Sequence, residues 1–152
     1  MDYAVYEDTP HTDAWMRAIL FTPSLIILTS AIIMPAEEPW LPALLIFMAL
    51  AAGTLPFTLI PTKLSILSSS ILIGFRLPYT FRIPFNTVVT LRPSRWSSIG
   101  INLPTNMSQS NAVEIVRKHR LSVTITPSDR QAFMANFEKA VQEWKTYEGR
   151  GL

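Results

Sequence analysis

The first 62 residues hold two long uncharged stretches that are separated by only two charged residues. The stretches cover residues 18–36 and 39–62, and Glu37 and Glu38 lie between them. A helix needs about 20 apolar residues to cross the hydrocarbon core of a bilayer, which is about 30 Å thick. The pattern therefore predicts a transmembrane helical hairpin over residues 17–62.

From Lys63 onward the pattern changes to short alternating segments, which are typical of β-strands. Apolar side chains recur at every second position on both sides of Ser68-Ser69-Ser70, and again on both sides of Lys118-His119-Arg120. Each of these arrangements indicates a hairpin of two antiparallel strands. In total, about seven short strands fit between residues 63 and 125.

The period changes once more near the C-terminus. Thr126-Pro127-Ser128-Asp129 is typical of a helix start, with Thr126 as the expected cap. An apolar stripe with helical spacing follows, made of Phe133, Phe137, Val141 and Trp144. We expect an amphipathic helix that ends near Tyr147 and closes the open end of the sheet.

Charge divides the chain into two unlike parts. Residues 1–61 carry six acids and one base, a net charge of −5, whereas residues 62–152 carry twelve bases and five acids, a net charge of +7. Lys and Arg are enriched on the cytoplasmic side of membrane proteins. We therefore expect both termini in the cytoplasm, with Glu37 and Glu38 on the outer side. The acidic segment before the first stretch does not fit a cleaved signal peptide.

Several kinds of chemistry have no matching residues in the sequence. The apolar stretches contain no Asp, Glu, Lys, Arg or His, which are the residues that mark ion and proton paths. The chain has no cysteine, no glycine-rich phosphate loop and no histidine pair with metal-site spacing. We expect no catalytic residue, no metal site and no cofactor, and we expect neither an enzyme nor a transporter.

Three segments of the chain resemble the bacterial pleckstrin-homology-like (PH-like) domains of small membrane proteins. They are Arg82-Ile-Pro-Phe85 with Val88-Val89, then Val113-Glu-Ile-Val116 with residues 121–129, and finally Gln131-Ala-Phe133. The resemblance covers residues 63–147 and implies an α+β membrane protein, in which a PH-like barrel or sandwich of seven strands is capped by a C-terminal α-helix. It also implies a two-pass protein of the bacterial inner membrane.

Two basic clusters are candidate contacts for lipid or for a partner protein. The first comprises Arg92, Arg95 and Trp96, and the second comprises Arg117, Lys118 and Arg120. Each basic residue near an anionic leaflet contributes about 1 kcal/mol of attraction, but the clusters equally fit an ordinary cytoplasmic surface. Inositol-lipid recognition is not implied, because the first hairpin, residues 64–75, carries no charge. Nucleic acid is not an expected partner, because no basic and aromatic stripe recurs.

Small residues in the second apolar stretch are candidates for helix packing. They are Ala49, Ala52 and Gly53. Small side chains let helices approach closely in lipid. These residues serve either to pack the hairpin against itself or to dock another membrane protein, and the sequence leaves both roles open.

The expected function is that of a non-catalytic, membrane-anchored interaction or scaffold protein. Its more specific form is an accessory or assembly subunit of a larger membrane complex. Resemblance to assembly factors of bacterial photosynthetic reaction centres makes a photosynthetic or respiratory complex a candidate. The alternative is peripheral sensing of anionic lipid by the basic PH-like domain. Membrane lipids and other membrane protein subunits are the expected partners.

The sequence thus predicts four parts. They are an N-terminal cytoplasmic tail over residues 1–16, the hairpin over 17–62, the PH-like domain over 63–147 and a short tail over 148–152. The N-terminal tail is acidic and aromatic. It fits packing on the chain's own domain and packing on a basic partner equally well.

Overall fold

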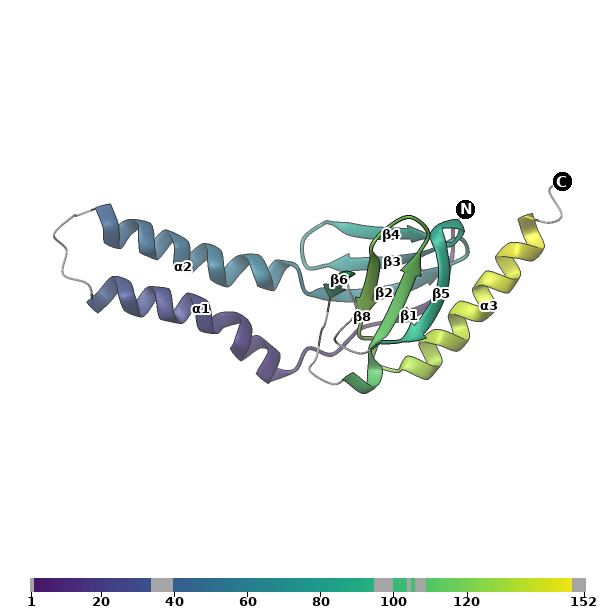
Figure 1. Cartoon of the computed structure of the whole chain (residues 1–152), viewed down its shortest axis with the longest axis horizontal. Helices are drawn as coiled ribbons and strands as arrows, with labels where there is room; N and C mark the ends of the chain where they lie inside the picture. Colours follow the sequence, from purple (N-terminus) through teal and green to yellow (C-terminus); the bar gives the residue numbers. More distant parts are fainter. Residues whose placement is uncertain (1, 34–39, 95–99, 104, 106–108, 149–152) are drawn as a thin grey trace.

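The chain folds into a pair of long helices and a domain of two β-sheets with a third helix (Figure 1). This computed structural model describes residues 2–33, 40–94, 100–103, 105 and 109–148. Within these residues the fold is α+β, with three α-helices and two four-stranded sheets. The predicted α+β class is therefore confirmed.

The first sheet is fully antiparallel and has the strand order β1-β2-β3-β4. Its strands span Ala4–Asp8, Pro61–Leu67, Ser70–Phe75 and Thr80–Pro84. The predicted hairpin around Ser68-Ser69-Ser70 is confirmed as the β2–β3 pair. Strand β1 comes from the segment that the sequence divided off as an N-terminal tail, so this segment belongs to the sheet.

The second sheet has the order β5-β7-β8-β6. Its strands span Val88–Pro93 (β5), Gly100–Leu103 (β6), Val113–Arg117 (β7) and Ser122–Ile125 (β8). β7 and β8 form the second predicted hairpin, and β6 lies parallel to β8 at the edge. Strands β2 to β8 are the seven strands expected after Lys63, and two short 3-10 helices, Phe85–Thr87 and Gln109–Asn111, connect parts of this region.

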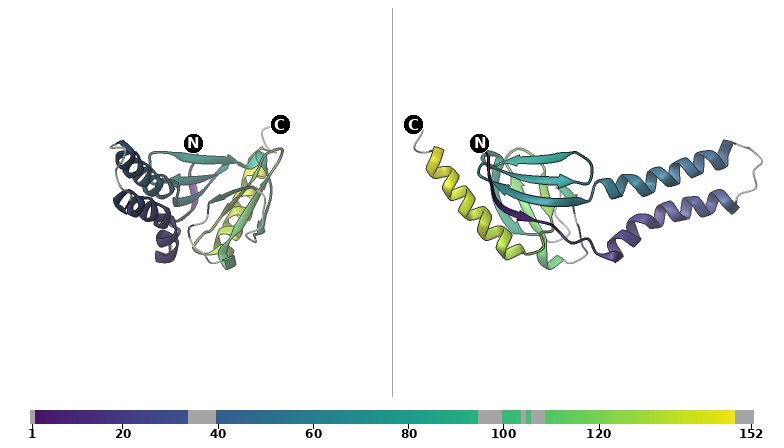
Figure 2. Two further views of the ribbon diagram at one scale, coloured as in Figure 1. Left: turned by 60° about the vertical axis from the view of Figure 1, so that its left-hand side comes forward. Right: turned by 180° about the vertical axis from the view of Figure 1, so that it is seen from behind.

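Helices α1 (Ala14–Ile33) and α2 (Trp40–Thr58) are inserted between β1 and β2, which are neighbours in the first sheet. Both ends of the helical pair are therefore joined to the same sheet edge. The two helices run side by side and project away from the domain in every view (Figures 1 and 2). Figure 1 also shows a bend in α1, which contains the interior proline Pro23. Proline bends a helix because it removes one backbone hydrogen bond and its ring clashes with the preceding turn.

The domain core lies between the two sheets and α3 (Arg130–Glu148). Alternate residues of the strands point into it and are fully buried, namely Leu64, Ile66, Ile71, Ile73, Ile83, Val113, Ile115, Val123 and Ile125. The predicted stripe of α3 is confirmed, because Phe133 and Phe137 are buried and Val141 and Trp144 pack against the same core. Figure 1 places α3 on the side of the sheets that is remote from the helical pair.

The predicted cap of this helix is wrong. Asp129 is the cap, since its Oδ1 accepts a hydrogen bond from the N–H of Ala132 at 2.9 Å and the helix begins at Arg130. Thr126 is instead buried, and its carbonyl oxygen accepts a bond from the Thr105 hydroxyl at 3.0 Å. The chain therefore stays extended beyond β8 before it turns into the helix.

Candidate interaction surfaces

The inner face of the helical pair is closed by small and hydroxyl side chains. The Ser24 hydroxyl of α1 donates to the carbonyl oxygen of Ala49 on α2 at 2.6 Å. A Cβ atom added at Gly53 would lie 3.0 Å from Ser24 Oγ, so glycine permits this close approach. Ala49 and Gly53 are buried, while Ala52 is half-buried. Ala49 and Gly53 thus pack the two helices against each other.

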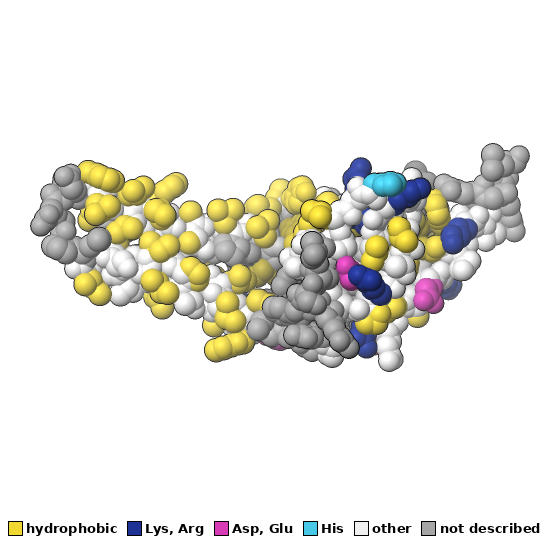
Figure 3. Space-filling view, viewed as in Figure 1, with side chains coloured by type: hydrophobic (Ala, Val, Ile, Leu, Met, Phe, Trp, Pro, Cys, Tyr) yellow, Lys and Arg dark blue, Asp and Glu magenta, His cyan; other side chains and the backbone are white. Residues whose placement is uncertain are grey.

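The outer face of the pair is apolar and exposed. Eight large apolar side chains in the described part of the pair are at least 60% exposed, namely Trp15, Leu25, Ile26, Ile32, Ile33, Phe47, Leu50 and Leu55. Figure 3 shows apolar side chains spread along the whole length of the pair. Exposed apolar surface of this extent marks a contact with lipid or with another protein.

The hydroxyl groups of the pair are satisfied within the pair. Thr22, Thr29 and Ser30 each donate to the carbonyl oxygen four residues earlier in α1. Thr54 and Thr58 donate to carbonyl oxygens of α2, and Ser24 bridges to α2. A helix surrounded by lipid requires such internal partners, because no water is present to replace them.

By length and composition, one helix in the described part of the chain can cross a membrane. This helix is α1, and only 11% of its apolar window is buried, so it is not a core helix of the two-sheet domain. The described apolar part of α2, Trp40–Leu55, is shorter.

The first predicted basic cluster is only partly described. Arg92 and Glu114 face each other across β5 and β7, and Arg92 Nε donates to Glu114 Oε2 at 2.7 Å. This bond lowers the pKa of the buried Glu114 carboxyl below its ordinary value and raises the pKa of Arg92. Arg92 is therefore engaged in an ion pair within the sheet. Arg95 and Trp96 lie outside the described residues.

The second predicted cluster lies at the β7–β8 turn. Arg117 Nε donates to the Leu121 carbonyl oxygen at 2.7 Å, and its guanidinium lies 5.5 Å from the centre of the Phe81 ring. Burial, with a smaller contribution from Arg120, lowers the pKa of Arg117. Lys118 and Arg120 are exposed.

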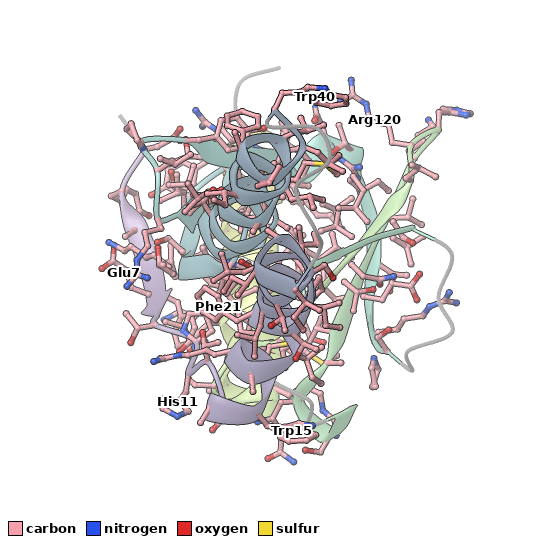
Figure 4. The ribbon with its side chains drawn as sticks, turned by 90° about the vertical axis from the view of Figure 1, so that its left-hand side faces the viewer. Glu7, His11, Trp15, Phe21, Trp40 and Arg120 are labelled. Carbon is pink, nitrogen blue, oxygen red and sulfur yellow. The ribbon has the colours of Figure 1, made fainter. Side chains whose placement is uncertain are left out.

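The β7–β8 turn lies at the top edge of the domain, away from the left-hand side where the helices enter (Figure 1), and Figure 4 labels Arg120 at this upper edge. His119 adopts a positive φ of 54° there, which helps the short turn to close. The described members of the two predicted clusters do not form one patch at the helical pair.

The acids of the N-terminal segment bind the chain's own domain. Asp2 accepts hydrogen bonds from the Ser68 and Ser69 hydroxyls and pairs with Arg82. The Ser69 bond is the largest cause of the lowered pKa of Asp2. Two further acids of this segment, Glu7 and Asp8, pair with Lys63 at 2.7 Å and with the backbone N–H and hydroxyl of Ser128, respectively. Of the two roles left open by the sequence, the structure therefore shows packing on the chain's own domain.

Two hollows lined by described residues were not indicated by the sequence. A surface pocket of about 450 Å³ is lined by Tyr3, Ser68, Ser69, Glu143, Trp144 and Tyr147. A smaller hollow of about 60 Å³ is lined by Thr12, Arg17, Ile60, Thr62 and Arg76, at the junction between helices and domain. Both join residues that are far apart in the sequence, and both depend on the pairing of β1 with β2. No local pattern signals that pairing.

Among the side chains that the structure describes, no group of three or more His, Cys, Asp or Glu residues is placed to hold a metal ion. Comparison with protein-family models, curated proteins and solved structures finds no match to this chain. The PH-like resemblance and the function therefore stay predictions.

Proposed function

We propose that this chain is a non-catalytic, membrane-anchored interaction protein, and that it serves as an accessory or assembly subunit of a larger membrane complex. The observation that carries the proposal is the helical pair, whose inner face is closed by Ser24, Ala49 and Gly53 while its outer face is apolar along its whole length. Such a surface is stable only when lipid or protein covers it.

The dimensions of the pair support an anchor that crosses the bilayer twice. At about 1.5 Å per residue, the 20 residues of α1 and the 19 residues of α2 each give a length close to the bilayer core of about 30 Å. Trp15 lies in the first turn of α1 and Trp40 is the first residue of α2, so these two exposed residues are at opposite ends of the pair (Figure 1), at the levels where tryptophan meets lipid headgroups. In this arrangement the basic two-sheet domain lies on the cytoplasmic side of a bacterial inner membrane.

The two-sheet domain is, in this proposal, a PH-like module that contacts the partner. The succession of β2 to β8 followed by the amphipathic α3 supports this assignment. Strand β1 is an addition to the expected seven strands, and it ties the module to the anchor. A photosynthetic or respiratory complex stays a candidate partner.

Peripheral lipid sensing through the predicted basic clusters has less support. Arg92 is paired with Glu114, and the β7–β8 turn lies away from the entry of the helices (Figure 1). Binding of the full chain to anionic vesicles after Lys118→Gln and Arg120→Gln tests this alternative. A large loss of binding would favour it.

The proposal is tested by alkaline carbonate extraction followed by purification in mild detergent. We expect the full chain to stay in the membrane pellet and to co-purify with a membrane protein at a fixed ratio. Matched variants with Leu25→Lys and Phe47→Lys on the outer face should release the chain, whereas Lys118→Gln should not. Complete release of the unmodified chain by carbonate, or a chain that purifies without any stoichiometric partner, would contradict the proposal.

A further inference from the structure

A rigid, exposed turn stands beside the point where α2 runs into β2. This β3–β4 turn, residues 76–79, lies at the end of the domain that faces the helical pair (Figure 1). The Tyr79 N–H donates to the Leu77 carbonyl oxygen at 2.6 Å, and the Phe75 N–H donates to the Tyr79 carbonyl oxygen at 3.2 Å. The Tyr79 ring also stacks on Phe75, with ring centres 5.5 Å apart. These contacts fix the turn while leaving Leu77 53% and Tyr79 57% exposed.

Other large apolar side chains are exposed at the same level of the molecule. Trp15, in the first turn of α1, is 66% exposed, and Leu59, directly after α2, is 55% exposed. Both residues belong to the helix ends that join the domain, and Figure 4, which looks along the helical pair, labels Trp15 at the lower edge of the view. Water-exposed Leu, Trp and Tyr are unfavourable, but amphipathic rings are stable at the level of lipid headgroups. Contact with a membrane surface would remove the exposed apolar area of these residues from water.

Two arginines from separate elements line the same hollow in this region. Arg17 of α1 and Arg76 of the β3–β4 turn line the 60 Å³ hollow, together with the hydroxyl-bearing Thr12 and Thr62. The nearby Lys63 is neutralised by Glu7, and Asp13 is an acid within one turn of Arg17. The net charge of the two arginines and Asp13 is therefore positive. Guanidinium groups bind phosphate oxygens through paired, charge-assisted hydrogen bonds.

We propose that this junction rests on the headgroup layer of the membrane and binds the phosphate of an anionic phospholipid between Arg17 and Arg76. The junction consists of Trp15, Arg17, Leu59, Arg76, Leu77 and Tyr79. The inference rests on the proposed membrane anchoring. A lipid headgroup is the natural occupant, because the hollow opens where both helices leave the domain and headgroups are the neighbouring groups at that level. The hollow is also too small for a drug-sized ligand, which takes about 300 Å³ or more. The junction would hold the domain at a fixed height and tilt above the membrane.

The seating of the turn is tested by site-directed fluorescence in lipid nanodiscs. Because the chain has no cysteine, Leu77→Cys gives a single labelling site, and Leu121→Cys at the β7–β8 turn is a matched exposed control. We expect lipids that carry a quencher in the headgroup to quench the label at position 77 and to leave the label at position 121 bright. Equal quenching at both positions, or none at position 77, would overturn the proposed seating.

The phosphate site is tested by titrating the full chain in detergent with phosphatidylglycerol and recording bound lipid by native mass spectrometry. We expect Arg17→Gln and Arg76→Gln each to weaken binding about fivefold. Lys118→Gln with Arg120→Gln should leave the affinity unchanged. Phosphatidylcholine should bind more weakly than phosphatidylglycerol, and inorganic phosphate should not displace the lipid.

Equal binding of the two lipids, insensitivity to both arginine substitutions, or displacement by inorganic phosphate would overturn the lipid site. A melting curve of each variant separates loss of the site from loss of folding. Carbonate extraction of the same variants separates the two proposals. A chain that stays in the membrane but fails these tests contradicts the junction alone, whereas a chain released by carbonate contradicts the anchor.

Discussion

The helical pair and the two-sheet domain place the same residue type in opposite environments. Ile32 and Ile33 at the end of α1 are about three-quarters exposed, whereas Ile66 and Ile73 in the first sheet are completely buried. In the domain, apolar side chains form the interior and charged side chains the surface. In the helical pair, Ser24, Ala49 and Gly53 close the inner face and large apolar groups form much of the surface. The difference shows that the two regions are built for different surroundings.

Polar groups follow the same division. Buried polar side chains in the domain, such as Glu114 and Asp8, are held by an arginine or by backbone and hydroxyl donors. In the described part of the chain, no buried polar side-chain atom lacks a hydrogen-bond partner. The domain therefore satisfies its polar groups across strands, whereas most hydroxyls of the helices bond within their own helix. Among the hydroxyls described in the two helices, the one of Ser24 reaches across the pair.

Truncation of a side chain in the apolar stripe of α3 should have the largest effect on stability and should destabilise the two-sheet domain alone. Phe133 is completely buried and packs edge-on against Tyr6 at 6.1 Å. We expect Phe133→Ala to lower the free energy of unfolding by about 3–5 kcal/mol, because it leaves a cavity. Phe47→Ala on the outer face of α2 is the matched control. Urea unfolding of the full chain in detergent measures both, and a similar loss in both variants would contradict the division into two environments.

Enlarging the glycine at the helix contact should separate the helices but spare the domain. In Gly53→Leu the new side chain would collide with Ser24 and meet Phe21. Overpacking of this kind costs about 1–3 kcal/mol. Thermal unfolding in detergent, recorded separately for helix and sheet signals, should show the loss in the helical transition. Leu50→Ala on the outer face should leave the temperature of that transition unchanged. An unchanged helical transition in Gly53→Leu would contradict a stabilising role for the contact between Gly53 and Ser24.

Acid should weaken the second sheet through Glu114. The pKa of Glu114 lies below its ordinary value in the folded chain, because Arg92 donates to the carboxylate. The unfolded chain therefore takes up the proton at higher pH, and stability falls as the pH drops from the ordinary pKa of a glutamate through the lowered one. Glu114→Gln should remove this part of the pH dependence, and Arg92→Gln should do the same, because each removes one partner.

Urea midpoints measured at successive pH values check this expectation. The double variant should lose no more than either single variant, since both act on one interaction. A wild-type chain whose stability does not change on acidification would contradict it.

The smallest effect is expected at the edge of the first sheet. Lys63 and Glu7 form an ion pair at 2.7 Å, but about half of each side chain is exposed. Exposed pairs contribute about 0.2–1 kcal/mol and are screened by salt. Lys63→Gln should therefore shift the urea midpoint slightly at low ionic strength and not at high ionic strength. A shift that is independent of salt would indicate that the lysine acts through packing instead.

Much of the fold could be read from local patterns. The two hairpins at Ser68-Ser69-Ser70 and Lys118-His119-Arg120 were predicted because the strands alternate strictly around short polar turns. The α3 stripe was predicted because its spacing matches the helical period. The cap was assigned to Thr126 instead of Asp129, because the sequence does not show that Thr126 continues the extended chain and bonds to Thr105. The contact role of the two basic clusters stays a prediction.

The sequence by itself determined the division of the chain into an apolar part and an alternating part, since hydrophobic period and charge are local properties. Only the tertiary structure decided that residues 4–8 complete the first sheet, that Ala49 and Gly53 face Ser24, and that Arg17 and Arg76 line the same hollow at the junction. Each of these contacts joins segments that are distant in the sequence. The bond between Asp8 and Ser128 spans 120 residues in the same way. Pairing over such a span depends on how all elements pack together, and no local pattern contains that information.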